Sequence, residues 1–182
     1  MEFMKASSPG SVISRFIEVA RQYPEHTAVR YRDQLGWHAQ SCDQLLAAAR
    51  NTARTLAAKG LARGQSVLVP SLRHERLCAD LLGILWAGGN FVFIDPNYPA
   101  ERQRFLCEQA QAKFGIGPAH WRAEVELAVD WIAVKDEPDE SGVPVPPDDP
   151  ELPCYIIFTS GSTGTPYWRT SALLTRQLLI PG

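Results

Sequence analysis

The strongest constraint on the fold is the alternation of strand-like and helix-like patterns between residues 67 and 116. Short runs of apolar, β-branched and aromatic residues predict buried strands, and the helical spacing of apolar residues between them predicts helices. Strands are expected at 67–69, 91–94 and 114–116, and helices at 74–87 and 99–112. Because the connections are short, we expect parallel pairing with right-handed crossovers. The sequence therefore predicts an α/β fold with a parallel sheet and flanking helices.

Further elements are predicted before this region. Apolar residues at helical spacing predict an amphipathic helix over 12–22. Two strand-like runs, 27–31 and 37–40, flank a turn and predict an N-terminal β-hairpin. Ser41 and Gln44 have the spacing of a capping box, which predicts that a second helix begins directly after the hairpin.

The apolar run 154–158 predicts another buried strand, and it changes abruptly into hydroxyl residues and glycines. Gly161 and Gly164 permit close backbone approach, so successive N–H groups could surround a phosphate together with the neighbouring hydroxyls. No lysine follows Gly164 and the spacing is not G-x-S-x-G, so this is neither a Walker A loop nor a nucleophile elbow. A flexible Ser/Gly loop is the alternative. The residues expected to bind phosphate are Thr159, Ser160, Gly161, Ser162, Thr163, Gly164 and Thr165.

The stretch T-S-G-S-T-G-T-P at 159–166 resembles the signature T-S-G-[ST]-T-G-x-P-K-G of the adenylate-forming (AMP-binding) superfamily. Where that signature has Lys-Gly, this chain has Tyr167 and Trp168. Residues 85–102 resemble the pattern L-x-A-G-x-x-[YF]-V-P-[IL]-D-P-x-[YF]-P-x-x-R, which is typical of nonribosomal peptide synthetase adenylation domains. We assign no catalytic role to Asp95 or Arg102 of that pattern; an exposed ion pair or a cap is the expectation.

The resemblance implies the N-terminal part of an amino-acid-activating domain. In that family, ATP with Mg²⁺ and a carboxylic acid, usually an amino acid, give an acyl-adenylate, and the acyl group passes to the phosphopantetheine thiol of a carrier protein. An acyl- or aryl-acid activating ligase and a non-catalytic nucleotide-binding or interaction module are the alternatives. The later motifs of the family find no match before Gly182, so we expect no complete adenylation by this chain alone.

Composition excludes several other classes. A net charge of -2 and 45% hydrophobic residues give no argument for nucleic acid or for an anionic membrane as a partner. No apolar run is long enough to span a bilayer and no signal peptide is evident, so a cytoplasmic protein is expected. The four cysteines are widely spaced and read as reduced core residues, with a disulfide or zinc as the alternative. No catalytic residue or metal ligand is assigned.

The chain is expected to divide into five segments: a disordered or vector-derived N-terminus (1–10), an α/β region (11–135), an acidic proline-rich linker (136–153), the strand with its phosphate loop (154–166) and a divergent tail (167–182). In the tail, leucines at helical spacing favour a short helix, and their exposure could give an oligomer contact. These leucines are Leu173, Leu174, Leu178 and Leu179.

Overall fold

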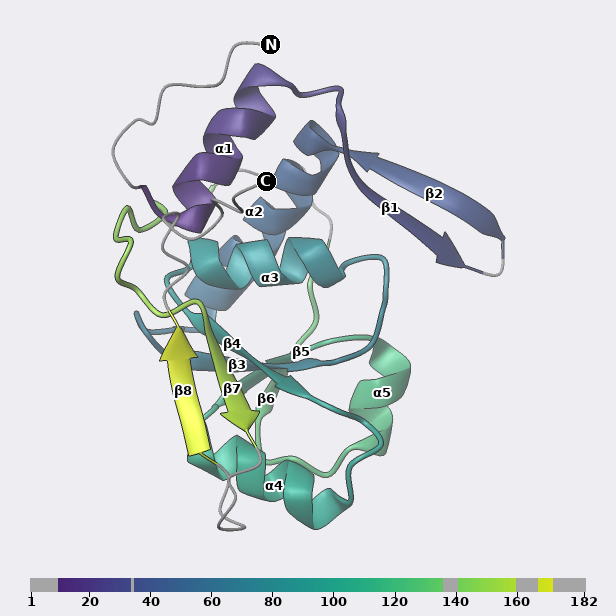
Figure 1. Cartoon of the computed structure of the whole chain (residues 1–182), viewed down its shortest axis with the longest axis vertical. Coiled ribbons are helices and arrows are strands. Elements are labelled where there is room, and N and C mark those ends of the chain that lie inside the picture. Colours follow the sequence, from purple (N-terminus) through teal and green to yellow (C-terminus); the bar gives the residue numbers. More distant parts are fainter. Residues whose placement is uncertain (1–9, 34, 136–140, 160–166, 172–182) are drawn as a thin grey trace, which may run out of the picture.

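The computed structural model describes residues 10–33, 35–135, 141–159 and 167–171, which form helices around a twisted sheet together with a separate hairpin (Figure 1). The helices are α1 (Val12–Gln22), α2 (Cys42–Ala58), α3 (Leu77–Trp86), α4 (Ala100–Gln109) and α5 (Ala119–Glu124). The strands are β1 (Thr27–Asp33), β2 (Gly36–Ser41), β3 (Ser66–Pro70), β4 (Asn90–Ile94), β5 (Phe114–Ile116), β6 (Asp130–Ile132), β7 (Tyr155–Thr159) and β8 (Tyr167–Ser171).

The main sheet has the strand order β6-β5-β3-β4-β7-β8. The neighbours from β6 to β7 pair in parallel, and β8 pairs antiparallel to β7. In β3, Val67 and Val69 join the apolar cluster formed with α1, α2 and α3, whereas Leu68 joins the cluster formed with α4. The alternating side chains of β3 are thus buried on both faces of the sheet, as a central parallel strand requires. The predicted α/β class is confirmed.

The predicted hairpin and capping box are both present. Strands β1 and β2 pair antiparallel and form a sheet of their own, away from the main sheet (Figure 1). The Ser41 hydroxyl accepts from the Gln44 N–H at 3.2 Å, and the Gln44 side chain accepts from the Ser41 N–H at 2.9 Å. Each bond satisfies a backbone N–H group that would otherwise lack a hydrogen-bond partner at the start of the helix. Local sequence signals therefore determine where α2 begins.

Two helix boundaries differ from the prediction. Helix α3 begins at Leu77 rather than at His74, because residues 74–76 form a turn in which the His74 carbonyl accepts from the Leu77 N–H at 3.1 Å. No side chain caps this helix start. Helix α4 ends at Gln109, since Gln111 has a φ of 50°, which is incompatible with a continued right-handed helix.

Three elements were not predicted. Helix α5 and strand β6 are short, and their tryptophans pack edge to face, Trp121 against Trp131, with ring centroids 5.1 Å apart. Strand β8 begins the segment 167–182, for which a divergent tail with a helix was expected. The helix was expected at Leu173 to Leu179, so the pairing of residues 167–171 with β7 does not contradict it. The expected leucine helix lies outside the described residues.

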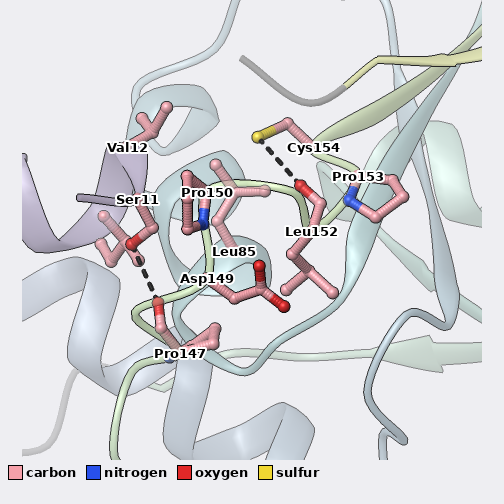
Figure 2. A pocket seen from close by; sticks show the side chains of 10 residues that line it. Ser11, Val12, Leu85, Pro147, Asp149, Pro150, Leu152, Pro153 and Cys154 are labelled. Atoms are coloured by element: carbon pink, nitrogen blue, oxygen red, sulfur yellow. Dashed lines mark hydrogen bonds between the residues drawn. The ribbon is translucent and has the colours of Figure 1, made fainter. Parts of the chain in front are cut away.

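The described part of the acidic proline-rich segment is residues 141–153, of which 147–153 lie against the N-terminus of α1 (Figure 2). The Ser11 hydroxyl donates to the Pro147 carbonyl at 2.9 Å, and the Trp86 indole N–H donates to the Pro144 carbonyl at 2.8 Å. A cavity of about 20 Å³ remains between the two segments, which is room for one water molecule. The segment 141–153 therefore contacts both α1 and α3. The five segment boundaries expected from the sequence stay predictions.

Helices α2 and α3 approach very closely at Gly83. A Cβ atom at this position would lie 2.4 Å from the Thr52 Cβ and 2.7 Å from the Ala49 carbonyl oxygen. The buried Thr52 hydroxyl donates to the Asp80 carboxylate at 3.0 Å, and Arg76 also binds that carboxylate. Only glycine permits this helix spacing.

Candidate functional site

Strand β7 delivers the predicted phosphate loop to the carboxyl edge of the sheet. Phe91 and Val92 of β4 pair in parallel with Tyr155 and Ile156 of β7, so both strands end at the same edge. At this edge Thr159 pairs with Tyr167 of β8, which returns antiparallel. In open α/β sheets, ligands bind at the carboxyl ends of the strands. The strand that precedes the glycines thus has the position that a ligand-binding loop needs.

The predicted phosphate-binding residues are only partly placed. For Thr159 the structure gives the backbone pairing at the end of β7. Ser160, Gly161, Ser162, Thr163, Gly164 and Thr165 lie outside the described residues, so their assignment stays a prediction.

The Asp95 turn follows β4 at the same edge. The Asp95 carboxylate accepts from the Asn97 backbone N–H and from its side-chain amide, both at 2.9 Å. The Arg102 guanidinium lies 4.6 Å from the centre of the Tyr98 ring. Asp95 therefore caps its own turn, and Arg102 makes a cation–π contact at the start of α4. Both roles position the chain rather than react with a substrate.

Two apolar side chains stand exposed where β4 and β7 end. Phe93 is 39% exposed and Ile157 is 49% exposed. Continuing the parallel register from Phe91 and Tyr155 places them opposite each other on one face of the sheet. Helix α3 covers the preceding residues of this face but not these two, so an apolar surface lies beside the exit of β7.

A second feature of the carboxyl edge is a groove of about 860 Å³ between the hairpin, the β3–α3 loop and the ends of β5 and β6. Arginines from several segments line it: Arg30, Arg32, Arg73, Arg76 and Arg122. His74 and His120 also line it. Sequence reasoning missed this site because its residues come from separate segments. The available signal was that Arg73 and His74 follow a predicted strand and so belong to its carboxyl end.

The cysteines and histidines form no reactive or metal-binding constellation in the described part of the chain. All four cysteines are free thiols there; Cys42, Cys107 and Cys154 are buried and Cys78 is half-buried. Burial raises the pKa of Cys78, and it also raises the pKa of Cys107. Among the described residues, no cluster of three His, Cys, Asp or Glu side chains could hold a metal ion. Nor does the described chain contain a helix with the length and apolarity needed to cross a membrane.

Comparison with protein families gives a match over most of the chain. Residues 16–166 match the family described as AMP-binding enzyme. Gramicidin S synthase 2 from Brevibacillus brevis is 32% identical over 156 residues, which are 83% of this chain and 3% of that protein. Bacitracin synthase 1 from Bacillus licheniformis is 34% identical over 170 residues, 91% of this chain and 3% of that protein. The chain thus spans only a few per cent of the length of these curated relatives.

Solved structures agree with this assignment. The nonribosomal peptide synthetase FmoA3, in its AMPPNP-bound form, superimposes with a TM-score of 0.77 at 27% identity, over 92% of this chain and 18% of that one. A fatty acyl-adenylate ligase from L. pneumophila gives a TM-score of 0.79 over 89% of this chain and 30% of that one, but its 20% identity shows likeness of fold alone. The chain belongs to the AMP-binding enzyme family, and it is similar to the N-terminal part of nonribosomal peptide synthetase adenylation domains.

Proposed function

We propose that this chain forms the N-terminal part of an amino-acid-activating adenylation domain. The observation that carries the proposal is the sequence T-S-G-S-T-G-T-P, which begins at the last residue of β7, a strand that ends at the carboxyl edge of a parallel sheet. In this function the carboxylate of an amino acid attacks the α-phosphorus of ATP. An aminoacyl-adenylate forms, and pyrophosphate leaves.

The loop residues Thr159 to Thr165 would hold the β- and γ-phosphates. Backbone N–H groups and hydroxyls arranged in advance around the leaving pyrophosphate would stabilise its developing charge. Mg²⁺ would be bound mainly by the phosphate oxygens, as is usual for this ion. The acyl group would then pass to the phosphopantetheine thiol of a carrier protein. Support for that partner comes from PA1221, a relative that contains adenylation and PCP domains and is 25% identical.

The Asp95 turn favours an amino acid over an acyl or aryl acid as substrate. It belongs to a pattern typical of amino-acid-activating domains, and in this chain it is formed by the Asp95 and Asn97 side chains. A non-catalytic nucleotide-binding role is the second candidate. It is favoured by Tyr167, which replaces the lysine of the family signature and so removes a positive charge beside the phosphates.

Calorimetric titration of the 182-residue chain with Mg·ATP tests the phosphate loop. We expect saturable binding that weakens in Gly161→Ala and Gly164→Ala, because a Cβ would block close approach of the phosphates. Gly10→Ala is the matched control, since the nearest atom to its new Cβ would be 3.4 Å away, beside Asp148 and far from β7 in sequence. A folded chain that binds no Mg·ATP, or binds it equally well in the loop variants, would contradict the proposal.

Pyrophosphate exchange tests whether the chain is catalytically complete by itself. The proposal places the adenine, selectivity and catalytic-lysine motifs of the family outside this chain, so we expect no exchange above a no-enzyme control with any amino acid. Exchange by this chain alone would show that it is a complete enzyme and would refute its role as part of a larger domain.

A further inference from the structure

The groove lined by arginines lies at the carboxyl ends of the neighbouring strands β3 and β5. Strands β3 and β5 are neighbours, but their connections leave toward opposite faces of the sheet. After β3 the chain enters α3, which packs in the cluster with α1 and α2. After β5 it enters α5, whose Trp121 packs on Trp131 beside the α4 cluster. Such a divergence creates a crevice at the carboxyl ends, which is the usual ligand position in open α/β sheets.

The charges in this groove are unbalanced. Asp80 is engaged by Thr52 and Arg76, and Asp33 accepts a hydrogen bond from His38 at 2.9 Å. Glu75 is the remaining acidic side chain among the residues that line the groove. Against it stand four further arginines with no carboxylate partner in the described part of the chain: Arg30, Arg32, Arg73 and Arg122. The groove therefore carries an excess of positive charge.

Polar atoms of two groove residues that have no carboxylate partner are buried without a hydrogen-bond partner among the described residues. They are Nε of Arg122 and Nε2 of His74. Burying such a group unsatisfied costs free energy, so a ligand that supplies an acceptor to the Arg122 Nε–H is favoured here. The pKa of His74 is lowered by burial and then by the charges of Arg76 and His120, which places its imidazole in a positive field.

We propose that this groove is a binding site for an organic phosphate, separate from the loop at 159–165. A phosphate can accept hydrogen bonds from several guanidinium groups at once, and here they come from the hairpin, the β3–α3 loop and α5. The N-terminal end of α3 also lies at the groove and adds its partial positive charge. The volume of about 860 Å³ exceeds what one anion fills, and Tyr31 and the 67% exposed Trp37 offer aromatic surface for an organic part.

The test follows the imidazole NMR signals of His74 and His120 while the chain is titrated with phenyl phosphate, with inorganic phosphate and with phenol. We expect phenyl phosphate to shift both histidines with a Kd of about 1 mM or tighter, inorganic phosphate to bind more weakly and phenol to leave the signals in place. Absence of any shift at about 10 mM phenyl phosphate would overturn the proposal.

Variants assign the binding to this groove. Arg73 is exposed, so Arg73→Gln should fold normally and weaken phenyl phosphate binding about tenfold. Arg21→Gln removes an exposed arginine of α1 outside the groove and should have no effect. Gly161→Ala should also leave this binding unchanged, whereas it weakens Mg·ATP binding under the proposed function. Equal affinity in Arg73→Gln, or loss of binding in Gly161→Ala, would place the phosphate elsewhere and refute the inference.

Discussion

The close approach of α2 and α3 makes Gly83→Ala a sharp test of the packing. The new Cβ would lie 2.4 Å from the Thr52 Cβ, although ordinary contacts begin near 3.4 Å, so the helices must separate by about 1 Å. The Ala49 carbonyl oxygen, at 2.7 Å, belongs to the backbone and cannot rotate away. The substitution therefore acts on the whole helix pair.

Three effects set the magnitude. Overpacking of a tight interior costs about 1–3 kcal/mol. Weakening the buried bond from Thr52 to the Asp80 carboxylate adds about 1.5–3 kcal/mol, because hydrogen bonds to charged groups are strong. Alanine has a higher helix propensity than glycine, which stabilises the folded state by about 1 kcal/mol and offsets part of this loss. We expect a net loss of about 1.5–5 kcal/mol in the free energy of unfolding.

Urea denaturation followed by circular dichroism measures this loss, and thermal unfolding should show a midpoint lower by about 3–20 °C. Gly10→Ala serves as the control, because its Cβ meets no atom closer than 3.4 Å. If Gly83→Ala unfolds at the same urea concentration as the wild type, or a higher one, helix propensity outweighs the contact and the described spacing of α2 and α3 is wrong.

Three further predictions concern other parts of the chain. Ser41→Ala breaks the capping box and should lower the free energy of unfolding by about 1 kcal/mol in urea melts; an unchanged midpoint would mean that Gln44 alone suffices. A hydrogen bond from His38 lowers the pKa of Asp33, so His38→Ala should raise the Asp33 pKa in a carboxyl NMR titration; an unchanged pKa would contradict this cause. The stabilisation that ionised Asp33 contributes is present above its unfolded-state pKa and is lost as pH falls through its folded-state pKa. Tyr167→Lys supplies the lysine of the family signature and should tighten Mg·ATP binding about tenfold by calorimetry, whereas equal affinity would argue against a phosphate beside this position.

The elements that local sequence determines were predictable. The capping box at Ser41 and the apolar runs of β3 and β4 carry their own signals, and the structure has them within a residue or so of the expected positions. Strand β6 has three residues and is formed by pairing with β5, so no local sequence pattern predicts it. In β8 the residues Tyr167 to Thr170 favour a strand, but the strand forms only through pairing with β7. The prediction for this segment was based on the leucines that follow it, which favour a helix.

The two candidate sites also differ in how far the sequence alone could reveal them. The phosphate loop is contiguous in sequence, so its pattern was visible from residues 159–166 alone, although the loop itself remains a prediction. The arginine groove joins Arg32, Arg73 and Arg122, which the sequence separates widely. The strand order β5-β3 brings Arg73 and Arg122 to one crevice, and the separate hairpin adds Arg32. A single sequence contains no direct signal for such a site.

The late position of β7 in the chain has a consequence for synthesis. Strand β4 is complete at Ile94, but the neighbour on its second edge is not made until residues 155–159. During that interval the emerging polypeptide presents an apolar strand with an open row of backbone donors and acceptors, which is a template for association with other chains. Polypeptides that stop before Tyr155 would keep this edge permanently. We therefore expect the yield of monomer from successively longer C-terminal truncations to fall sharply once β7 is removed.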